Sequence, residues 1–224
     1  MTPDQPSFHI AVFARAPLAG HAKTRLMPLL GAVGAAAAQR AMTLRTLRVA
    51  AAATPGQVSL WAADTPDDPF FVECAQRLGL GRELQGAGDL GNRMASCLQQ
   101  LSRSRTVLLI GTDCPVWSVA ALAAAARALE EGAHLVFTPA EDGGYVLVGA
   151  RHRASVPMPA FQGIEWGSSQ VMAQSRARLT ELGWQCGREW RELPALWDID
   201  TPQDYLRACA AGLLAGDTLQ NKNG

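Results

Sequence analysis

Short apolar runs recur along the chain, each followed by a polar loop and then by a longer segment of helical composition. Residues 8–14 and 106–110 are continuous apolar runs, which are typical of strands buried on both faces of a parallel sheet. Further runs at residues 57–63, 133–138 and 145–148 predict three more strands. The last of these follows its predecessor closely, so we expect it to add an antiparallel member to the sheet.

Helical segments alternate with these strands. They are predicted at residues 34–53, 67–78, 89–101, 119–130, 168–182 and 201–214, and Gly or Pro residues punctuate several of them. Such alternation predicts an α/β protein with a mostly parallel sheet that helices cover on both faces. No repeat or linker divides the chain, so we expect a single domain over residues 1–224. Its structured core is expected at about 8–206, with a disordered tail at 217–224.

Composition narrows the class of protein. The 224 residues include 20 basic and 20 acidic side chains, so no global field favours nucleic acid or an anionic membrane. The five cysteines form no C-x-x-C pair, which favours a reduced compartment, and the four histidines lie too far apart to indicate zinc. No uncharged segment is long enough to span a membrane. We therefore expect a cytoplasmic protein that binds neither nucleic acid nor membrane.

Ligands of such sheets bind at the carboxyl ends of the strands, so the loops there carry the candidate chemistry. The first loop contains Arg15, Lys23, Thr24 and Arg25. Lysine acts as a point charge and arginine as a planar fork on phosphate oxygens, which suits a diphosphate; the alternative is a solvated basic loop. A P-loop is rejected, because its motif requires glycine at position 22, where the chain has Ala22.

A glycine-rich segment, Gly88-Asp-Leu-Gly-Asn-Arg93, precedes the third predicted helix. Its glycines permit close approach of a ligand to the backbone. Asp89 could also cap the helix, whose first amides would face an anion. A plain glycine turn with an aspartate cap is an equally weighted alternative.

The strongest local signal is the loop after residues 106–110, Gly111-Thr-Asp-Cys-Pro115. A carboxylate directly after a central strand can reach a divalent cation that bridges phosphate oxygens. We therefore favour a Mg²⁺ or Mn²⁺ site at Asp113. The alternative is a turn in which Asp113 precedes Pro115 and packs with Thr112. Cys114 is interpreted as a packing residue, because no histidine lies near it in sequence.

A second acidic loop leads into residues 145–148. Here Glu141 and Asp142 precede Gly143, Gly144 and Tyr145. One of the two carboxylates could bind a sugar hydroxyl, orient an acceptor or act as a general base. On this fragment alone, an Asp-Gly hairpin turn is slightly preferred.

A third acidic segment precedes the last predicted helix. Thr201 as N-cap, Pro202 at the first helical position and Asp204 in a capping box are explained by the helix start itself. Asp198 and Asp200 are not. We expect these two to face opposite ways along an extended segment, so that one of them completes the metal site with Asp113.

Six ordered motifs together resemble the bacterial glycosyltransferase A-like transferases, some of which are labelled radical-SAM/selenodomain-associated. The resemblance runs from about residue 8 to residue 206. Its motifs are Phe13-Ala-Arg-Ala-Pro17 with Gly20 and Lys23-Thr-Arg-Leu26, Gly88-Asp-Leu-Gly-x-Arg-Met94, Gly111-Thr-Asp-Cys-Pro115, Asp142-Gly-Gly-Tyr145, Ile164-Glu-Trp-Gly167 and Asp198-x-Asp-Thr-Pro-x-Asp204.

The resemblance implies a Rossmann-like, three-layer α/β/α nucleotide-diphosphosugar transferase fold, related to guanylyltransferases and sugar-nucleotide synthetases. It implies that Lys23 and Arg25 handle phosphates, and that Asp113 and Asp200 bind metal. The candidate site then comprises Lys23, Arg25, Asp113 and Asp142 for catalysis, Asp113, Asp198 and Asp200 for metal, and Ala14, Arg15, Thr24, Gly88, Asp89, Gly91, Arg93, Thr112, Gly143, Gly144, Tyr145, Glu165 and Trp166 for nucleotide or substrate.

The chain departs from its relatives in three places. Its first loop lacks the Gly-Gly pair of many nucleotidyltransferases, Arg15 stands where lysine is common, and one aspartate replaces the Asp-x-Asp of many glycosyltransferases. The leading hypothesis is a metal-dependent glycosyltransferase that uses a nucleotide-sugar and a small-molecule acceptor. The alternatives are a guanylyltransferase-like enzyme joining a nucleoside triphosphate to a phosphorylated acceptor, and a non-catalytic nucleotide-sugar binding protein.

Overall fold

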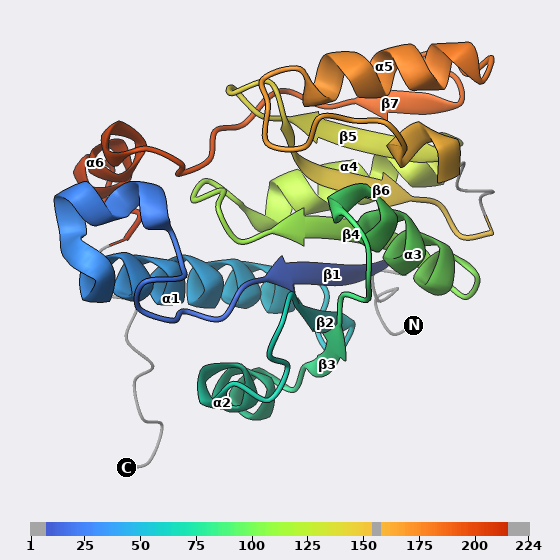
Figure 1. Ribbon diagram of the computed structural model, residues 1–224. Coiled ribbons are helices and arrows are strands. Elements are labelled where there is room, and N and C mark those ends of the chain that lie inside the picture. Colours follow the sequence, from blue (N-terminus) through green and yellow to red (C-terminus); the bar gives the residue numbers. More distant parts are fainter. Residues whose placement is uncertain (1–7, 154–157, 215–224) are drawn as a thin grey trace.

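The fold centres on a seven-stranded sheet. A computed structural model describes residues 8–153 and 158–214, so the tail expected at 217–224 lies outside the described residues. The strand order is β3-β2-β1-β4-β6-β5-β7 (Figure 1). The strands are β1 (Phe8–Ala14), β2 (Val58–Ala62), β3 (Gly81–Leu84), β4 (Thr106–Gly111), β5 (Leu135–Pro139), β6 (Tyr145–Ala150) and β7 (Trp190–Glu192). Strand β6 is antiparallel to both β4 and β5, and the other pairings are parallel, which confirms the expected sheet.

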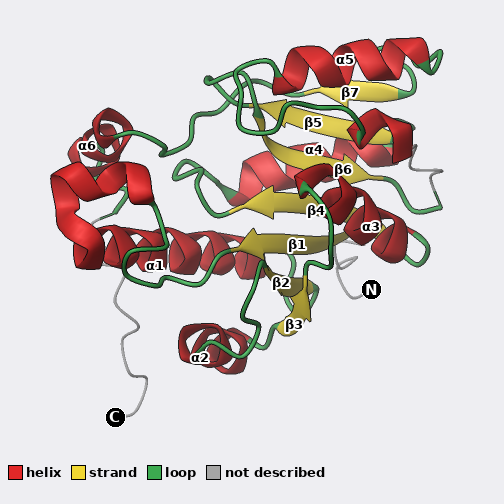
Figure 2. Ribbon diagram, viewed as in Figure 1, coloured by secondary structure: helices red, strands yellow, loops and turns green. Residues whose placement is uncertain are grey.

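Helices cover both faces of this sheet (Figure 2). They are α1 (Met27–Ala53), α2 (Pro69–Leu78), α3 (Leu90–Ser102), α4 (Val119–Glu130), α5 (Val171–Glu181) and α6 (Pro202–Ala210), with the 3-10 turns η1 (Thr24–Leu26) and η2 (Met158–Phe161). Successive side chains of β1 point to opposite faces of the sheet. Ile10 and Val12 pack with α1, α2 and α4, whereas Ala11 and Phe13 pack with α3 and α5. No helix among the described residues is long and apolar enough to cross a bilayer.

Several elements differ from the sequence expectation, among them helix α1 and strand β7. Helix α1 begins at Met27 instead of residue 34, and Gly31, with φ 67° and ψ 173°, separates two helical stretches within it. The first stretch is stabilised by tertiary packing, because Met27 and Leu30 pack against a third apolar cluster that includes Ala208 of α6. Strand β7 was not predicted, since three residues with two charged side chains carry no apolar pattern.

Candidate functional site

A pocket of about 510 Å³ opens where the parallel strands end. Ala14 closes β1, Ala63 follows β2, Gln85 follows β3 and Gly111 closes β4, and all four line the pocket. The start of β6 and the loop after β1 complete its walls. This is the edge at which open α/β sheets bind their ligands, so the fold places a cavity where the candidate residues were expected.

The pocket gathers part of the candidate set. Its lining includes Ala14, Arg15, Lys23, Thr24, Arg25, Arg93, Thr112, Asp113, Tyr145, Asp198 and Asp200. The other candidates lie outside the lining: Gly88, Asp89, Gly91, Asp142, Gly143, Gly144, Glu165 and Trp166. The lining residues that sequence reasoning did not select include His21, Gln39, Gln85 and Leu90.

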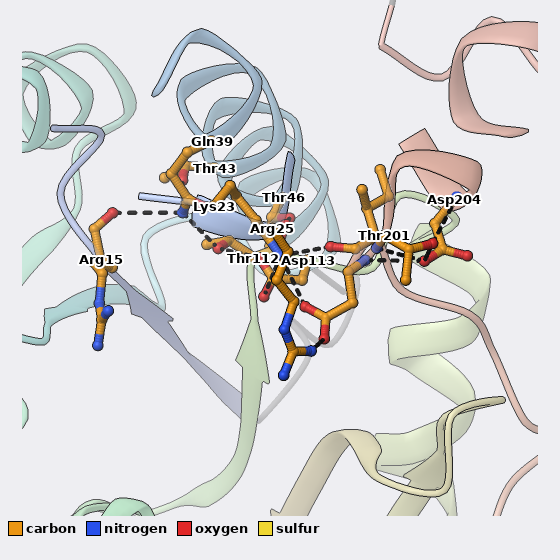
Figure 3. A network of polar contacts seen from close by, with 12 residues as sticks. Arg15, Lys23, Arg25, Gln39, Thr43, Thr46, Thr112, Asp113, Thr201 and Asp204 are labelled. Atoms are coloured by element: carbon orange, nitrogen blue, oxygen red, sulfur yellow. Dashed lines mark hydrogen bonds and ion pairs between the residues drawn. The ribbon is translucent and has the colours of Figure 1, made fainter. Parts of the chain in front are cut away.

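An ion-pair cluster at the pocket joins three distant segments of the chain (Figure 3). The ammonium of Lys23 lies 3.0 Å from Oδ2 of Asp113 and 3.7 Å from Oδ1 of Asp200, and it donates to the carbonyl of Ile199 at 2.6 Å. Arg25 pairs with the other carboxylate oxygen of Asp200. The Lys23 side chain is only 8% exposed, whereas the two carboxylates are 43% and 39% exposed. Lys23 thus holds two acids that remain open to the pocket.

The acidic segment 198–200 is fixed to the loop after β4. The amide of Ile199 donates to the carbonyl of Asp113 at 2.9 Å, and the Ile199 side chain is fully buried in the third apolar cluster. Asp198 and Asp200 both line the pocket, so the expectation that they face opposite ways is wrong. Positions two apart on an extended segment share one face, and the residue between them points to the other.

Several carboxylates surround Asp198 in the pocket. Burial, and then the charges of Asp142, Asp113 and Asp200, raise the pKa of this carboxyl from 3.8 to about 7, although Lys23 lowers it. Asp142 does not line the pocket, yet its charge acts on Asp198. Four carboxylates therefore share this region, and the two cations that pair with them, Lys23 and Arg25, do not balance their charge.

These residues fit a divalent cation. Asp113 and Asp200 both approach the Lys23 ammonium, so their carboxylates face a common point, and Asp198 lines the same pocket. Within the described ranges, no group of three or more His, Cys, Asp or Glu side chains could hold a metal by itself. Mg²⁺ is commonly held by one or two carboxylates together with substrate phosphates and water, so two acids are sufficient.

A buried amide connects the first loop with the loop after β4. Nε2 of Gln39, on α1, lies 3.1 Å from Oγ1 of Thr112, 3.2 Å from Oγ1 of Thr43 and 3.5 Å from the carbonyl of Arg15. The Thr112 hydroxyl in turn donates to Asp113 at 3.3 Å. Gln39 thereby positions the strand ends beneath the ion-pair cluster. Its sequence signal was a polar residue among the small residues of the predicted helix.

Arg93 lines the pocket close to the end of β3. Its Nη1 donates to Oε1 of Gln85 at 3.2 Å, and its Nε donates to the carbonyl of Asp89 at 3.3 Å. Gln85 is buried, and its Nε2 donates to the carbonyl of Trp61 at 2.9 Å. Leu90 also lines the pocket.

Asp89 and two candidate glycines have local structural roles. The Asp89 carboxylate accepts from the amide of Asn92 at 2.8 Å, which confirms the predicted helix cap. A Cβ on Gly91 would lie 2.2 Å from the carbonyl oxygen of Phe161, and one on Gly143 would lie 2.1 Å from that of Ser169. Neighbouring backbone therefore requires glycine at both positions, and their nucleotide-binding roles stay predictions.

The loop between β5 and β6 is a hairpin connection, as the alternative interpretation proposed. The Asp142 carboxylate accepts from the amide of Gly144 at 2.9 Å within this turn. Burial raises the pKa of Tyr145 well above its usual value, and its ring packs edge-on against Trp166 at 6.2 Å. The amide of Glu165 donates to the Gln174 side chain at 2.8 Å. Substrate roles for Asp142, Gly144, Glu165 and Trp166 remain predictions.

Solved structures share this fold. A protein from Desulfovibrio desulfuricans G20, described as a candidate nucleotide-diphospho-sugar transferase, has a TM-score of 0.76 at 24% identity, over 96% of this chain and 91% of that one. A cytidylyltransferase from Leptospira borgpetersenii has a TM-score of 0.57 at 11% identity, over 96% and 99%. Glucosyl-3-phosphoglycerate synthase from Mycobacterium tuberculosis, solved with Mn²⁺, UDP and glucosyl-3-phosphoglycerate, has a TM-score of 0.50 at 14% identity, over 92% and 77%.

These likenesses establish a nucleotide-diphosphosugar transferase fold. No curated protein sequence matches the chain. The family match covers residues 46–168, just over half of the chain, and includes the Gly88–Arg93 and Gly111–Pro115 loops. The chain therefore belongs to the family described as "Uncharacterized protein conserved in bacteria (DUF2064)".

Proposed function

We propose that the chain is a metal-dependent glycosyltransferase that uses a nucleotide-sugar donor. The observation that carries this proposal is the contact of Lys23 with Asp113 and Asp200 in a pocket at the strand ends. A site that binds a nucleotide diphosphate together with a metal ion needs cationic side chains for the phosphates and carboxylates for the metal, side by side. The fold likeness to a glucosyl transferase solved with Mn²⁺ and UDP supports this assignment.

Each charged group has a role in the proposal. Asp113 and Asp200 would hold Mg²⁺ or Mn²⁺, and the bound ion would offset the charge that develops on the departing diphosphate. Lys23 and Arg25 would exchange carboxylate partners for phosphate oxygens when the donor enters. Asp142, whose charge acts on Asp198, would orient the acceptor hydroxyl. Catalysis would rest on positioning and charge stabilisation, without a covalent nucleophile.

A second candidate is nucleotidyl transfer, in which a phosphorylated acceptor attacks a nucleoside triphosphate and pyrophosphate leaves. The observation that favours it is the higher TM-score with the cytidylyltransferase, 0.57 against 0.50 for the glucosyl transferase.

A non-catalytic nucleotide-sugar binding protein is the third candidate, motivated by the single aspartate after β4. A single domain, a cytoplasmic location and the radical-SAM/selenodomain-associated subtype stay predictions.

A product assay separates these candidates. Nucleotide-sugars and nucleoside triphosphates are incubated with sugar, alcohol and phosphorylated acceptors in Mg²⁺ or Mn²⁺, and free nucleoside diphosphate and pyrophosphate are measured. We expect nucleoside diphosphate release that Asp113→Asn abolishes and the exposed control Asp67→Asn retains. Pyrophosphate release would favour the second candidate. Unchanged turnover in Asp113→Asn would exclude the metal assignment.

A further inference from the structure

We propose that Arg93, held by Gln85, recognises the base of the nucleotide and selects guanine or cytosine over adenine and uracil. This inference rests on the proposed function, because it assigns the base to the same pocket. It concerns the part of the pocket at the end of β3, where Arg93 contacts Gln85.

The pocket is wide enough to separate phosphates from base. Gln85 follows β3, whereas Asp113 follows β4, and β2 and β1 lie between them in the sheet. Neighbouring strands lie about 4.8 Å apart, so three steps separate these two ends by roughly 14 Å. With the diphosphate at Lys23 and Asp113, the base of the nucleotide would extend toward Gln85 and Arg93.

The chemistry of this part of the pocket suits a flat ring. Leu90 is 37% exposed, and Ala63 and Met94 line the pocket beside it. Apolar side chains offer contact to the faces of a base, and a guanidinium can meet its polar edge. The polar side chains in this part of the pocket include those of Arg93 and Gln85, which contact each other.

Both polar atoms of the Gln85 amide are engaged within the protein. Its Nε2 donates to the carbonyl of Trp61 at 2.9 Å, its Oε1 accepts from Arg93 at 3.2 Å, and the residue is 5% exposed. Arg93 uses one donor on Gln85 and another on the carbonyl of Asp89. A guanidinium carries five N–H donors and no acceptor, so it presents donors that are fixed in direction.

The N–H donors of Arg93 favour a base whose edge carries two neighbouring acceptor atoms. Guanine presents O6 and N7, and arginine binds this pair in bidentate fashion. Cytosine presents O2 and N3 in the same way. Adenine places an amino donor beside N7, and uracil places N3–H between its two carbonyls. The expected discrimination is roughly ten- to a hundred-fold in dissociation constant for one bidentate pair.

The test measures binding of GDP, CDP, ADP and UDP by titration calorimetry in Mg²⁺, for the wild type, Arg93→Lys and Arg93→Met. We expect GDP or CDP to bind the wild type at least about ten-fold more tightly than ADP and UDP. Arg93→Lys keeps the charge but loses the planar fork, so this ratio should fall toward one while ADP and UDP affinities stay nearly constant. Arg103→Met, an exposed change at the other end of α3, is the matched control.

Three results would overturn the inference. They are a wild-type preference for ADP or UDP, equal affinity for all four nucleotides, or an equal loss for all four in both Arg93 variants, as a phosphate contact would give. Gln85→Met provides a second variant, because it releases Arg93 without removing its charge and should also reduce the ratio. Binding of all four nucleotides without discrimination overturns this inference alone, whereas failure of every nucleotide to bind also overturns the proposed function.

Discussion

One ammonium group at the mouth of the pocket contacts two carboxylates that lie far apart in the sequence. Lys23 adopts a left-handed backbone conformation, with φ 47° and ψ 48°, that brings its side chain to Asp113 and Asp200. Both carboxylates are more than a third exposed, so solvent screens the ion pairs and their net contribution to stability is small. At the residue scale, the cluster is better suited to exchanging ligands than to holding the fold together.

Asp198 makes stability depend on pH at this site. Its folded pKa of about 7 exceeds its ordinary value of 3.8, so the native state retains a proton that the unfolded state releases between about pH 4 and 7. Wild-type stability should therefore fall as pH rises through this window. Asp198→Asn removes this dependence, and its melting temperature in EDTA should exceed that of the wild type at pH 8 but not at pH 4. Equal differences at both pH values would contradict the assignment, and Asp67→Asn serves as the control.

The sequence indicated part of the site because some residues carry their signal locally. Asp113 follows an apolar run directly, and Lys23 lies in a basic loop, so both could be selected from neighbours alone. Gln85 has no such signal, and Gln39 has only its polarity among small residues, because the importance of both comes from hydrogen bonds to residues distant in sequence. The expectation that Asp198 and Asp200 face opposite ways was wrong for a different reason. Side chains alternate along an extended segment, so two residues that are two positions apart lie on the same face.

At the scale of elements, the best predictions rest on uninterrupted patterns with clear ends. Helix α4 has the expected bounds, because Ser118 caps its start through the amide of Ala121 and glycine follows its end. Strand β4 extends the expected run by one residue. Strand β7 and the first turns of α1 were missed, because pairing with β5 and packing against α6 stabilise them. Such long-range contacts leave no periodic pattern in their own segments.

Because α3 packs closely against η2, we predict that one methyl group added at Gly91 strongly reduces the stability of the fold. In Gly91→Ala the added Cβ would lie 2.2 Å from the Phe161 carbonyl and 2.7 Å from Trp166. We expect a loss of about 1–3 kcal/mol in the free energy of unfolding, measured by urea denaturation. Gly81→Ala is the matched control, because its nearest contact would be Ser59 at an ordinary 3.6 Å. Equal stability of the two variants would show that α3 can shift away from η2.

At the scale of the whole molecule, the site depends on a contact between the two ends of the described chain. The third apolar cluster joins Leu26 of η1 and Ala38 of α1 with Trp197, Ile199 and Ala208 near the carboxyl end. Helix α6 accordingly lies beside the start of α1 (Figure 1). This packing carries Asp198 and Asp200 to the loop that contains Lys23. The fold therefore completes the site only when its last segment docks.

Truncation of Ile199 should weaken the docking and the site together. Ile199→Ala removes a fully buried side chain, which costs about 2–5 kcal/mol of unfolding free energy, whereas Ile199→Val costs about 0.5–1.5 kcal/mol. Nucleotide affinity, measured at a temperature where each variant remains folded, should fall more in Ile199→Ala than in Ile199→Val. Full affinity in a destabilised Ile199→Ala would mean that the placement of Asp198 and Asp200 does not matter for binding.

The most direct test of the metal-dependent nucleotide site is a thermal-shift titration with nucleoside diphosphates, with and without Mg²⁺. Saturation at about a hundred times the dissociation constant should add roughly 2.7 kcal/mol to the free energy of unfolding. We predict a rise in melting temperature that requires both nucleotide and Mg²⁺, disappears in Asp113→Asn and persists in Asp67→Asn. A nucleotide-induced rise that neither Mg²⁺ removal nor Asp113→Asn changes would contradict the account.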